Sequence, residues 1–238
     1  MSGAGRLRIF GENPMNSLNN FRIALVVSAL LIGAYTAASV LAEMSASNRP
    51  GFPSDPTKIV SPVSKMPNWI EAVLAFRSDL EGNRALIVAL QALQSYKTAP
   101  VTDQVAQKAQ AALKQALSNA PYNSELWLAL ALLRTERDPR DPALVEALKM
   151  SYFTAPNDPQ LMPVRLDTAT LFDALSDADL KELARGDLRL MLTRQADLKP
   201  AVTSAYRRAS SLGRNFLEES VQSIDPAFTP ILRGQKPT

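Results

Sequence analysis

Hydrophobic residues gather most densely in one segment near the N-terminus. The stretch IALVVSALLIGAYTAASVLA, residues 23–42, contains no charged side chain, while Arg22 precedes it and Glu43 follows it. At ~1.5 Å of rise per residue, a helix of this length would extend about 30 Å, which matches the hydrocarbon core of a bilayer. The pattern predicts a transmembrane helix over residues 23–42.

Two other structures would place the same hydrophobic residues differently. A signal peptide cleaved after Ala42 would use the small side chains of Val40 and Ala42, although the hydrophobic region of a signal peptide usually spans only ~7–15 residues. A buried core helix would need a domain to cover it, and the next helical pattern begins only near residue 68. An uncleaved anchor is therefore the favoured interpretation, with the signal peptide as its main alternative.

Basic residues near the ends of the span favour one orientation. Arg6, Arg8 and Arg22 precede the hydrophobic segment, and Arg49 and Lys58 follow it. Because basic residues that flank a span tend to stay in the cytoplasm, this small excess and the free amine favour residues 1–22 as a cytoplasmic tail. The rest of the chain is then expected outside the cytoplasm, which in a bacterium means a periplasmic domain at the inner membrane.

Proline marks residues 43–67 as a linker, with prolines at positions 50, 53, 56, 62 and 67. Proline lacks the backbone donor and disfavours helical geometry in the residue before it. The segment is expected to form an extended spacer that reaches up to ~60 Å at ~3.1 Å per residue. A Pro-rich docking peptide is the alternative, but no repeated PxxP pattern with flanking basic residues is present, which favours a plain tether.

Beyond the linker, apolar residues recur at spacings of three and four, which is the period of an amphipathic helix. Segments of alternating polar and β-branched residues are missing there, and Ala and Leu are abundant. The pattern predicts an all-α domain over residues 68–224 and a flexible tail over 225–238. The predicted helices cover residues 68–80, 84–96, 102–121, 124–134, 143–156, 157–175, 177–195 and 199–223. Their expected N-terminal caps are Asn83, Thr102, Asn123 or Ser124, the Asp141-Pro142 pair, and a capping box of Ser176 with Asp179.

Two segments of this domain repeat each other. NAPYNSELWLALALL and TAPNDPQLMPVRLDT align Ala120-Pro121 with Ala155-Pro156, and Leu126 with Leu161, at an offset of 35 residues. A fixed period of this length, built of two helices and closed by proline, is typical of helical-hairpin solenoids. The repeat therefore favours antiparallel helix pairs stacked one after another.

The chain here resembles the tetratricopeptide repeat family. Trp127, Leu130 and Ala131 match the first helix of that motif, and Ser151 and Pro156 match the end of the second. Weaker matches upstream extend the resemblance over residues 68–169 and involve Trp69, Phe76, Ala85, Ala92, Ala109, Ala116 and Pro121. The resemblance implies a right-handed, TPR-like stack of antiparallel helices whose concave face binds peptides or proteins without catalysis.

The sequence departs from the family pattern in four places. Arg134 stands where an aromatic residue is usual, and one residue is inserted before Pro156. The Leu-Gly pair is absent after Trp69, and Arg165 falls on an apolar position beyond Leu161.

The helix SELWLALALLR, residues 124–134, is apolar on more than one face. In the stack that the resemblance implies, its Leu128 and Leu132 would line the concave groove and contact a partner, as exposed apolar patches often do. The alternative is that the C-terminal helices fold back over both side chains and bury them.

Composition excludes several kinds of chemistry. The chain has no Cys and no His, which rules out thiol nucleophiles, disulfides, imidazole catalysis and Cys or His metal ligands. The net charge is +3 and the basic residues form no stripe, so nucleic-acid binding is not expected. The carboxylates form no convincing catalytic pair, and no glycine-rich phosphate loop is present. Arg207, Arg208 and Arg214 form a small basic face that a lipid headgroup or a polysaccharide phosphate could contact.

Together these patterns predict a non-catalytic, single-pass membrane scaffold without a cofactor, whose helical domain binds partner proteins. The resemblance suggests a process at the cell envelope, such as polysaccharide synthesis or export. The alternative is an accessory subunit held in a larger membrane complex mainly by its transmembrane helix. Gly33 and Ala37, spaced four apart, would then form the small face that packs against another helix.

Overall fold

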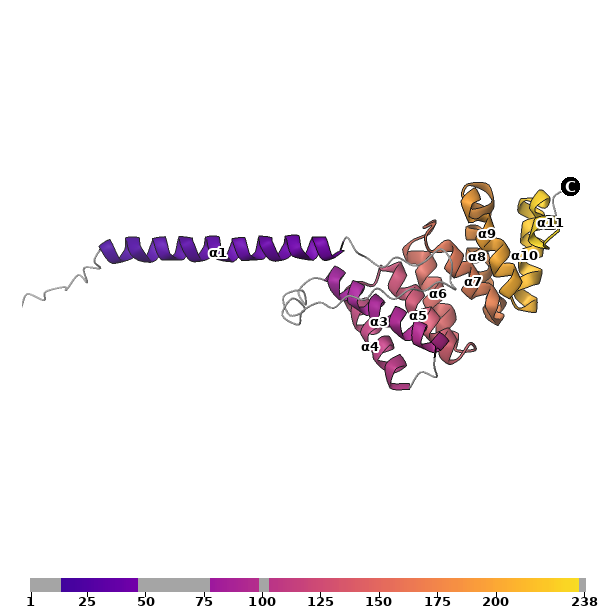
Figure 1. The fold of residues 1–238 in the computed structure, drawn as a ribbon, viewed down its shortest axis with the longest axis horizontal. Helices are drawn as coiled ribbons and strands as arrows, with labels where there is room; N and C mark the ends of the chain where they lie inside the picture. The colour runs from indigo at the N-terminus through magenta and orange to yellow at the C-terminus, as the bar shows by residue number, and fades with distance from the viewer. Residues whose placement is uncertain (1–13, 47–77, 99–102, 236–238) are drawn as a thin grey trace, which may run out of the picture. The chain divides into compact units, whose positions relative to one another are not determined.

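The computed structural model describes residues 14–46, 78–98 and 103–235, and every regular element in these ranges is a helix (Figure 1). This agrees with the predicted all-α class. The chain divides into two compact units, residues 1–48 and residues 49–238, each of which is described by itself.

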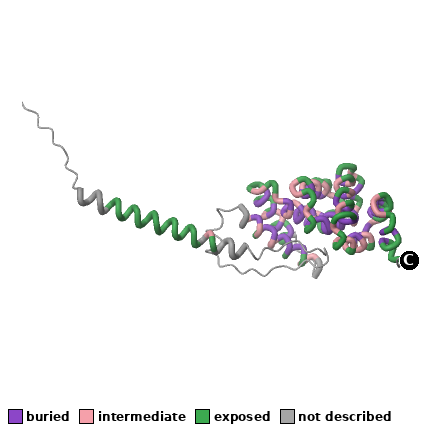
Figure 2. Tube along the Cα trace, turned by 90° about the horizontal axis from the view of Figure 1, so that it is seen from above, coloured by how far each residue is buried: buried purple, intermediate pink, exposed green. Residues whose placement is uncertain are grey.

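The first unit contains one long helix, α1 (Pro14–Ala46), which includes the whole predicted span. Its apolar residues lie all around the helix, and residues 20–37 are exposed throughout, as the green colour along α1 in Figure 2 shows. Thr36 Oγ1 donates to the carbonyl of Gly33 at 2.9 Å, so this hydroxyl is satisfied within the helix. The segment Asn20–Ala37 is long and apolar enough to cross a membrane, a property that a signal sequence shares.

The second unit begins with an antiparallel pair, α3 (Ser78–Thr98) and α4 (Asp103–Asn119). Asn119 at the end of α4 donates to Glu81 near the start of α3 at 2.6 Å, which shows the two helices running in opposite directions. Asn83, predicted to begin a new helix, instead lies within α3. This turn of α3 faces the next hairpin, since a Cβ on Gly82 would lie in ordinary contact distance, 3.6 Å, from both Asn123 and Leu126. Of the helix predicted over residues 68–80, only residues 78–80 are described, and they belong to α3. Residues 68–77 and the predicted cap Thr102 lie outside the described residues.

The next pair, α5 (Ser124–Arg137) and α6 (Pro142–Thr154), forms a tight antiparallel hairpin. Asn123 caps α5 by accepting hydrogen bonds from the backbone N–H groups of Glu125 and Leu126 at 3.1 and 3.2 Å, as predicted. Asp141 caps α6 and accepts from Ala143 N–H at 2.9 Å, with proline in the first turn as predicted. Helix α5 also packs against α3 and α4.

The chain then forms α7 (Met162–Leu171), the short 3-10 helix η2 (Asp173–Ser176) and α8 (Ala178–Thr193). The predicted capping box of Ser176 with Asp179 is not formed. Asp177 caps α8 by accepting from Leu180 N–H at 2.8 Å, and the Ser176 hydroxyl instead donates to the Asp173 carbonyl at 2.7 Å. The helix therefore begins one residue later than the prediction, because η2 uses Ser176 to close its own turn.

The predicted single helix over residues 199–223 is two helices in the structure, α9 (Lys199–Arg208) and α10 (Ser211–Ile224). The helix is interrupted at Ser210, whose backbone N–H and hydroxyl both donate to the carbonyl of Thr170, at 3.0 and 3.2 Å. Gly213 lies so close to the same residue that a Cβ would overlap the Thr170 carbonyl oxygen. Contact with the end of α7 thus decides where the helix breaks.

Part of the segment that the sequence marks as a flexible tail, residues 225–238, forms short helices. A short 3-10 helix, η3 (Ala196–Leu198), precedes α9. After α10, the described chain continues with η4 (Pro226–Phe228) and α11 (Thr229–Leu232). Phe228 and Leu232 are buried and belong to the apolar core that joins α3 through α11.

Candidate functional site

The two residues predicted to line a partner groove lie in different environments. Leu128 has 0 % of its surface exposed and belongs to the core, because α5 is enclosed by α3, α4 and α6. Leu132 is half-buried and also packs against this core. The structure therefore places Leu128 where it offers no surface to a partner, and the helices that chiefly pack against α5 are α3, α4 and α6.

Among the described residues of the helical domain, the most exposed large apolar side chains lie elsewhere. Tyr122 is 83 % exposed just before α5, and Phe153 is 60 % exposed in the last turn of α6. The Ser151 hydroxyl donates to the Ser124 carbonyl at 3.0 Å, which brings the start of α5 and the end of α6 to the same end of the hairpin. The helical periodicity of the sequence did not single out these two aromatic residues; their position at helix ends was the available signal.

Gly33 and Ala37, the predicted helix-packing residues, lie on one face of α1. Ala37 is exposed, and a Cβ added to Gly33 would have no other atom within 4 Å. Both positions are thus open for close approach of another helix.

A buried polar cluster joins α6, α7 and α8. Arg165 has 0 % of its surface exposed although it is among the longest side chains of the chain. Its Nε donates to the Ser151 hydroxyl at 3.0 Å and its Nη1 to the Ala155 carbonyl at 2.9 Å, while Nη2 donates to the Ser151 carbonyl. The guanidinium also lies 5.0 Å from the centre of the Tyr152 ring. Arg165 therefore uses the carbonyls that are left free at the end of α6.

Asp187 of α8 faces the same cluster. It is 4 % exposed, and its Oδ2 is buried with no hydrogen-bond partner among the described residues, as is the Tyr152 hydroxyl. Burial raises the pKa of Asp187 to about 7, although the nearby Arg165 charge opposes the shift. Burial likewise raises the pKa of the Tyr152 hydroxyl well above its ordinary value. Since these atoms are closed to solvent, the cluster acts on the stability of the helix junction rather than on a ligand.

One member of the predicted basic face is already neutralised. Arg208 binds Asp167 of α7, with Nη2 2.7 Å and Nε 2.9 Å from the same carboxylate oxygen. Arg207 and Arg214 remain exposed on α9 and α10. The structure thus reduces the basic face to two side chains and gives Arg208 a role in joining α9 to α7.

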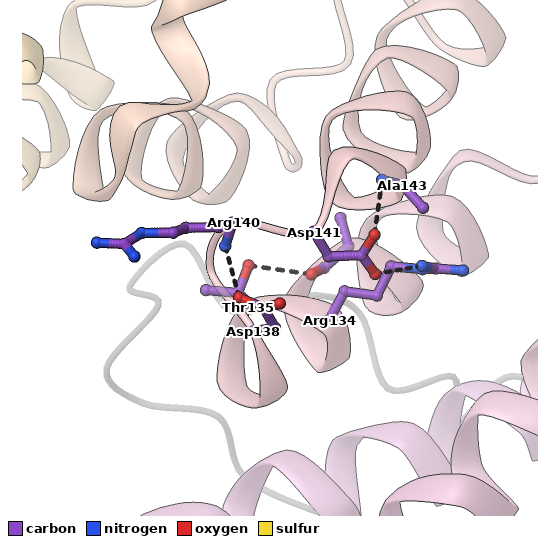
Figure 3. A network of polar contacts seen from close by, with 7 residues as sticks. Arg134, Thr135, Asp138, Arg140, Asp141 and Ala143 are labelled. Carbon is purple, nitrogen blue, oxygen red and sulfur yellow. Dashed lines mark hydrogen bonds and ion pairs between the residues drawn. The ribbon is translucent and has the colours of Figure 1, made fainter.

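A polar cavity of about 350 Å³ lies between α4 and the α5–α6 turn. Two of its lining residues contact each other directly: Arg134 Nη1 donates to Asp141 Oδ2 at 2.6 Å, a contact drawn as a dashed line in Figure 3. The lining side chains come from α4, the last turn of α5 and the turn itself: Gln110, Lys114, Arg134, Arg137, Asp138 and Asp141. Sequence reasoning noted Arg134 only as a departure from a repeat motif; the six residues meet because three separate elements converge.

Comparisons with known proteins identify no relative: no family model, curated protein or solved structure matches the chain. Within the described ranges, no group of three or more Asp or Glu side chains gathers where it could hold a metal ion.

Proposed function

We propose that the protein is a membrane-anchored, non-catalytic scaffold whose helical domain binds partner proteins outside the cytoplasm. The observation that carries this proposal is α1, in which apolar side chains face outward on all sides. A helix that is hydrophobic all round is stable only when it is enclosed, and the segment from Asn20 to Ala37 has the length for a bilayer to enclose it.

The arrangement of the first two helix pairs supports a TPR-like stack over part of the domain. Helices α3 and α4 form one antiparallel pair, α5 and α6 form the next, and α5 packs against both helices of the first pair. Beyond them the order changes, since α7 packs chiefly against α9 and α8. We therefore propose that the repeat-like portion ends near Thr154 and that the later helices close its end.

The partner surface that we propose is the aromatic end of the α5–α6 hairpin, defined by Tyr122 and Phe153. Exposed aromatic side chains are enriched at the centres of protein interfaces, where they contribute large buried area at little entropic cost. The resemblance to repeat scaffolds directs this proposal to a process at the cell envelope, such as polysaccharide synthesis or export. An accessory subunit held through Gly33 and Ala37 is the second candidate, favoured by the open surface around Gly33.

Membrane attachment is tested by fractionation of the intact chain. The proposal expects it to resist alkaline carbonate and to be released by detergent, with an intact mass that includes residues 1–42. Release by carbonate, or a mature mass that begins after residue 42, would contradict the anchor. Protease digestion of intact and lysed spheroplasts, with epitope tags at either end, tests the orientation.

Partner binding is tested by photocrosslinking in native membranes, with the crosslinker placed at Tyr122, at Phe153 and, as a control, at the exposed Ile231 of α11. A shared product at the first two positions that is absent at the third would support the aromatic end. A Tyr122→Ser, Phe153→Ser double variant should lose the partner seen in this product while its membrane attachment stays unchanged. If Gly33→Ile alone abolishes association, the accessory-subunit alternative is the better proposal.

A further inference from the structure

The polar cavity beside the α5–α6 turn contains more free donors than acceptors. Its lining holds three cationic side chains and two carboxylates, and Arg134 and Asp141 neutralise each other across 2.6 Å. Lys114 and Arg137 are exposed and form no ion pair or hydrogen bond with any described residue. Two positive charges on facing elements, α4 and α5, thus line the same cavity without a direct ion pair, and the six lining residues carry one more positive than negative charge.

The acidic residues of the cavity are positioned by the fold. Asp141 uses both carboxylate oxygens, one for Ala143 N–H at 2.9 Å and one for Arg134. Although partial burial opposes it, these two donors hold the pKa of Asp141 below its ordinary value. Asp138 Oδ1 accepts from Arg140 N–H at 3.0 Å, which leaves Oδ2 without a partner among the described residues. One carboxylate is therefore saturated, and the other keeps a free acceptor at the rim.

We propose that this cavity binds a small hydroxylated carboxylate of the sugar-acid class. The carboxylate of the ligand would lie between Lys114 and Arg137, since a guanidinium pairs with a carboxylate through two parallel hydrogen bonds. Its hydroxyl groups would donate to Asp138 Oδ2 and exchange hydrogen bonds with the Gln110 amide, which both donates and accepts.

Charge and size set the limits of this ligand class. A phosphate dianion would meet Asp138, Asp141 and the carbonyl end of α5, each of which carries negative charge or partial charge, so a single negative charge fits better. A cavity of about 350 Å³ has room for one sugar-sized ring and not for a folded chain. The site depends on neither membrane insertion nor the aromatic end, so its failure would leave the proposed function untouched.

Saturation-transfer difference NMR on the full chain in detergent micelles tests the proposal. D-glucuronate is the probe, D-glucose is the matched ligand without the carboxylate, and acetate is the matched ligand without hydroxyls. The proposal expects a signal for glucuronate with a dissociation constant on the order of 1 mM, a weaker signal for acetate and none for glucose. An equal response to glucose, or displacement of glucuronate by an equal concentration of inorganic phosphate, would overturn the ligand class.

Variants locate the binding to the cavity. Lys114→Gln combined with Arg137→Gln should weaken glucuronate binding by about tenfold or more, since two exposed charge contacts are lost. Arg140→Gln is the control, because Figure 3 shows this side chain extending away from Arg134 and Asp141. Unchanged affinity in the double variant, or an equal loss in the control, would contradict the site. The single variants are measured alongside, with circular dichroism to verify that each remains folded.

Discussion

Helices α5 and α7 are both enclosed by their neighbours, yet their sequences look different. Six of the eight buried residues of α5 are Leu or Ala, the others being Ser124 and Thr135, and its position inside the domain could be expected from hydrophobicity. Residues 161–170, which form most of α7, are all buried as well, but they include Arg165, Asp167, Thr168 and Thr170. Burial of α5 follows from composition, whereas burial of α7 depends on a partner for each polar group.

The partners of α7 show how that dependence is met. The two threonine hydroxyls donate to carbonyls one turn earlier in the same helix, at 2.7 and 2.8 Å. Arg165 and Asp167 instead find partners on α6 and α9. Since a buried charge that loses its partner is strongly destabilising, α7 should be far less tolerant of substitution than α5. The predictions below test this difference in order of decreasing effect.

The largest effect is expected where α10 meets the end of α7. Gly213→Ala would push a methyl group into the Thr170 carbonyl, and we expect a loss of about 4 kcal/mol or failure to fold. Gly186→Ala is the matched control, because this glycine lies in α8 with open space around it. The control should stabilise the chain by about 0.5–1 kcal/mol. Urea denaturation followed by circular dichroism measures both; similar free energies for the two variants would contradict the close contact.

Arg165→Ala should lower the free energy of unfolding by about 3–5 kcal/mol, because it removes the Arg165 donors from the Ser151 hydroxyl and the Ala155 carbonyl and opens a cavity. Arg165→Met, which preserves most of the volume, separates the two contributions. If the methionine variant restores full stability, the polar contacts of α7 are not what holds it in place, and the contrast with α5 disappears.

Leu128→Ala should lower the free energy of unfolding by about 2–4 kcal/mol, as for other fully buried leucines. Leu132→Ala, four residues later on the same helix and only half-buried, should cost clearly less. Neither loss should vary between pH 4 and pH 8, since no charge is involved. Equal effects at the two positions would show that Leu128 is not enclosed as the structure places it.

Asp187→Asn should change stability in a pH-dependent manner. The folded-state pKa of about 7 lies above the ordinary value of 3.8, so the folded chain favours the protonated carboxyl. The stability that this group contributes is complete below pH 4 and is lost as pH rises through 7. At pH 8 the asparagine variant should therefore be more stable than the parent, on the order of 1–3 kcal/mol, with little difference at pH 4.

The control for this pH dependence is Asp179→Asn, an exposed aspartate in the first turn of the same helix. It should show no gain at pH 8, because its carboxyl is not buried. Urea midpoints at pH 4, 6 and 8 provide the measurement, and a gain for Asp187→Asn that is constant across pH would contradict the shifted pKa.

Much of the fold could be read from the chain because the deciding interactions are local. The caps at Asn123 and Asp141 bond to backbone groups two or three residues away, so the residue type and its place before an apolar run are enough to predict them. The apolar stretch of α1 likewise needs no partner elsewhere in the chain to be recognised. Helix class, the first hairpins and the candidate membrane span follow from such short-range patterns.

The remaining features were decided only by the tertiary structure, because their partners lie far along the chain. The break between α9 and α10 depends on hydrogen bonds from Ser210 to Thr170, forty residues earlier. The burial of Leu128 depends on the helices that pack around α5, which are α3, α4 and α6, and the polar cavity exists because Lys114 and Arg137 are brought to facing helices. Periodicity tells which side of a helix is apolar, but it does not tell which helix will cover it; that is determined when all the apolar faces pack together at once.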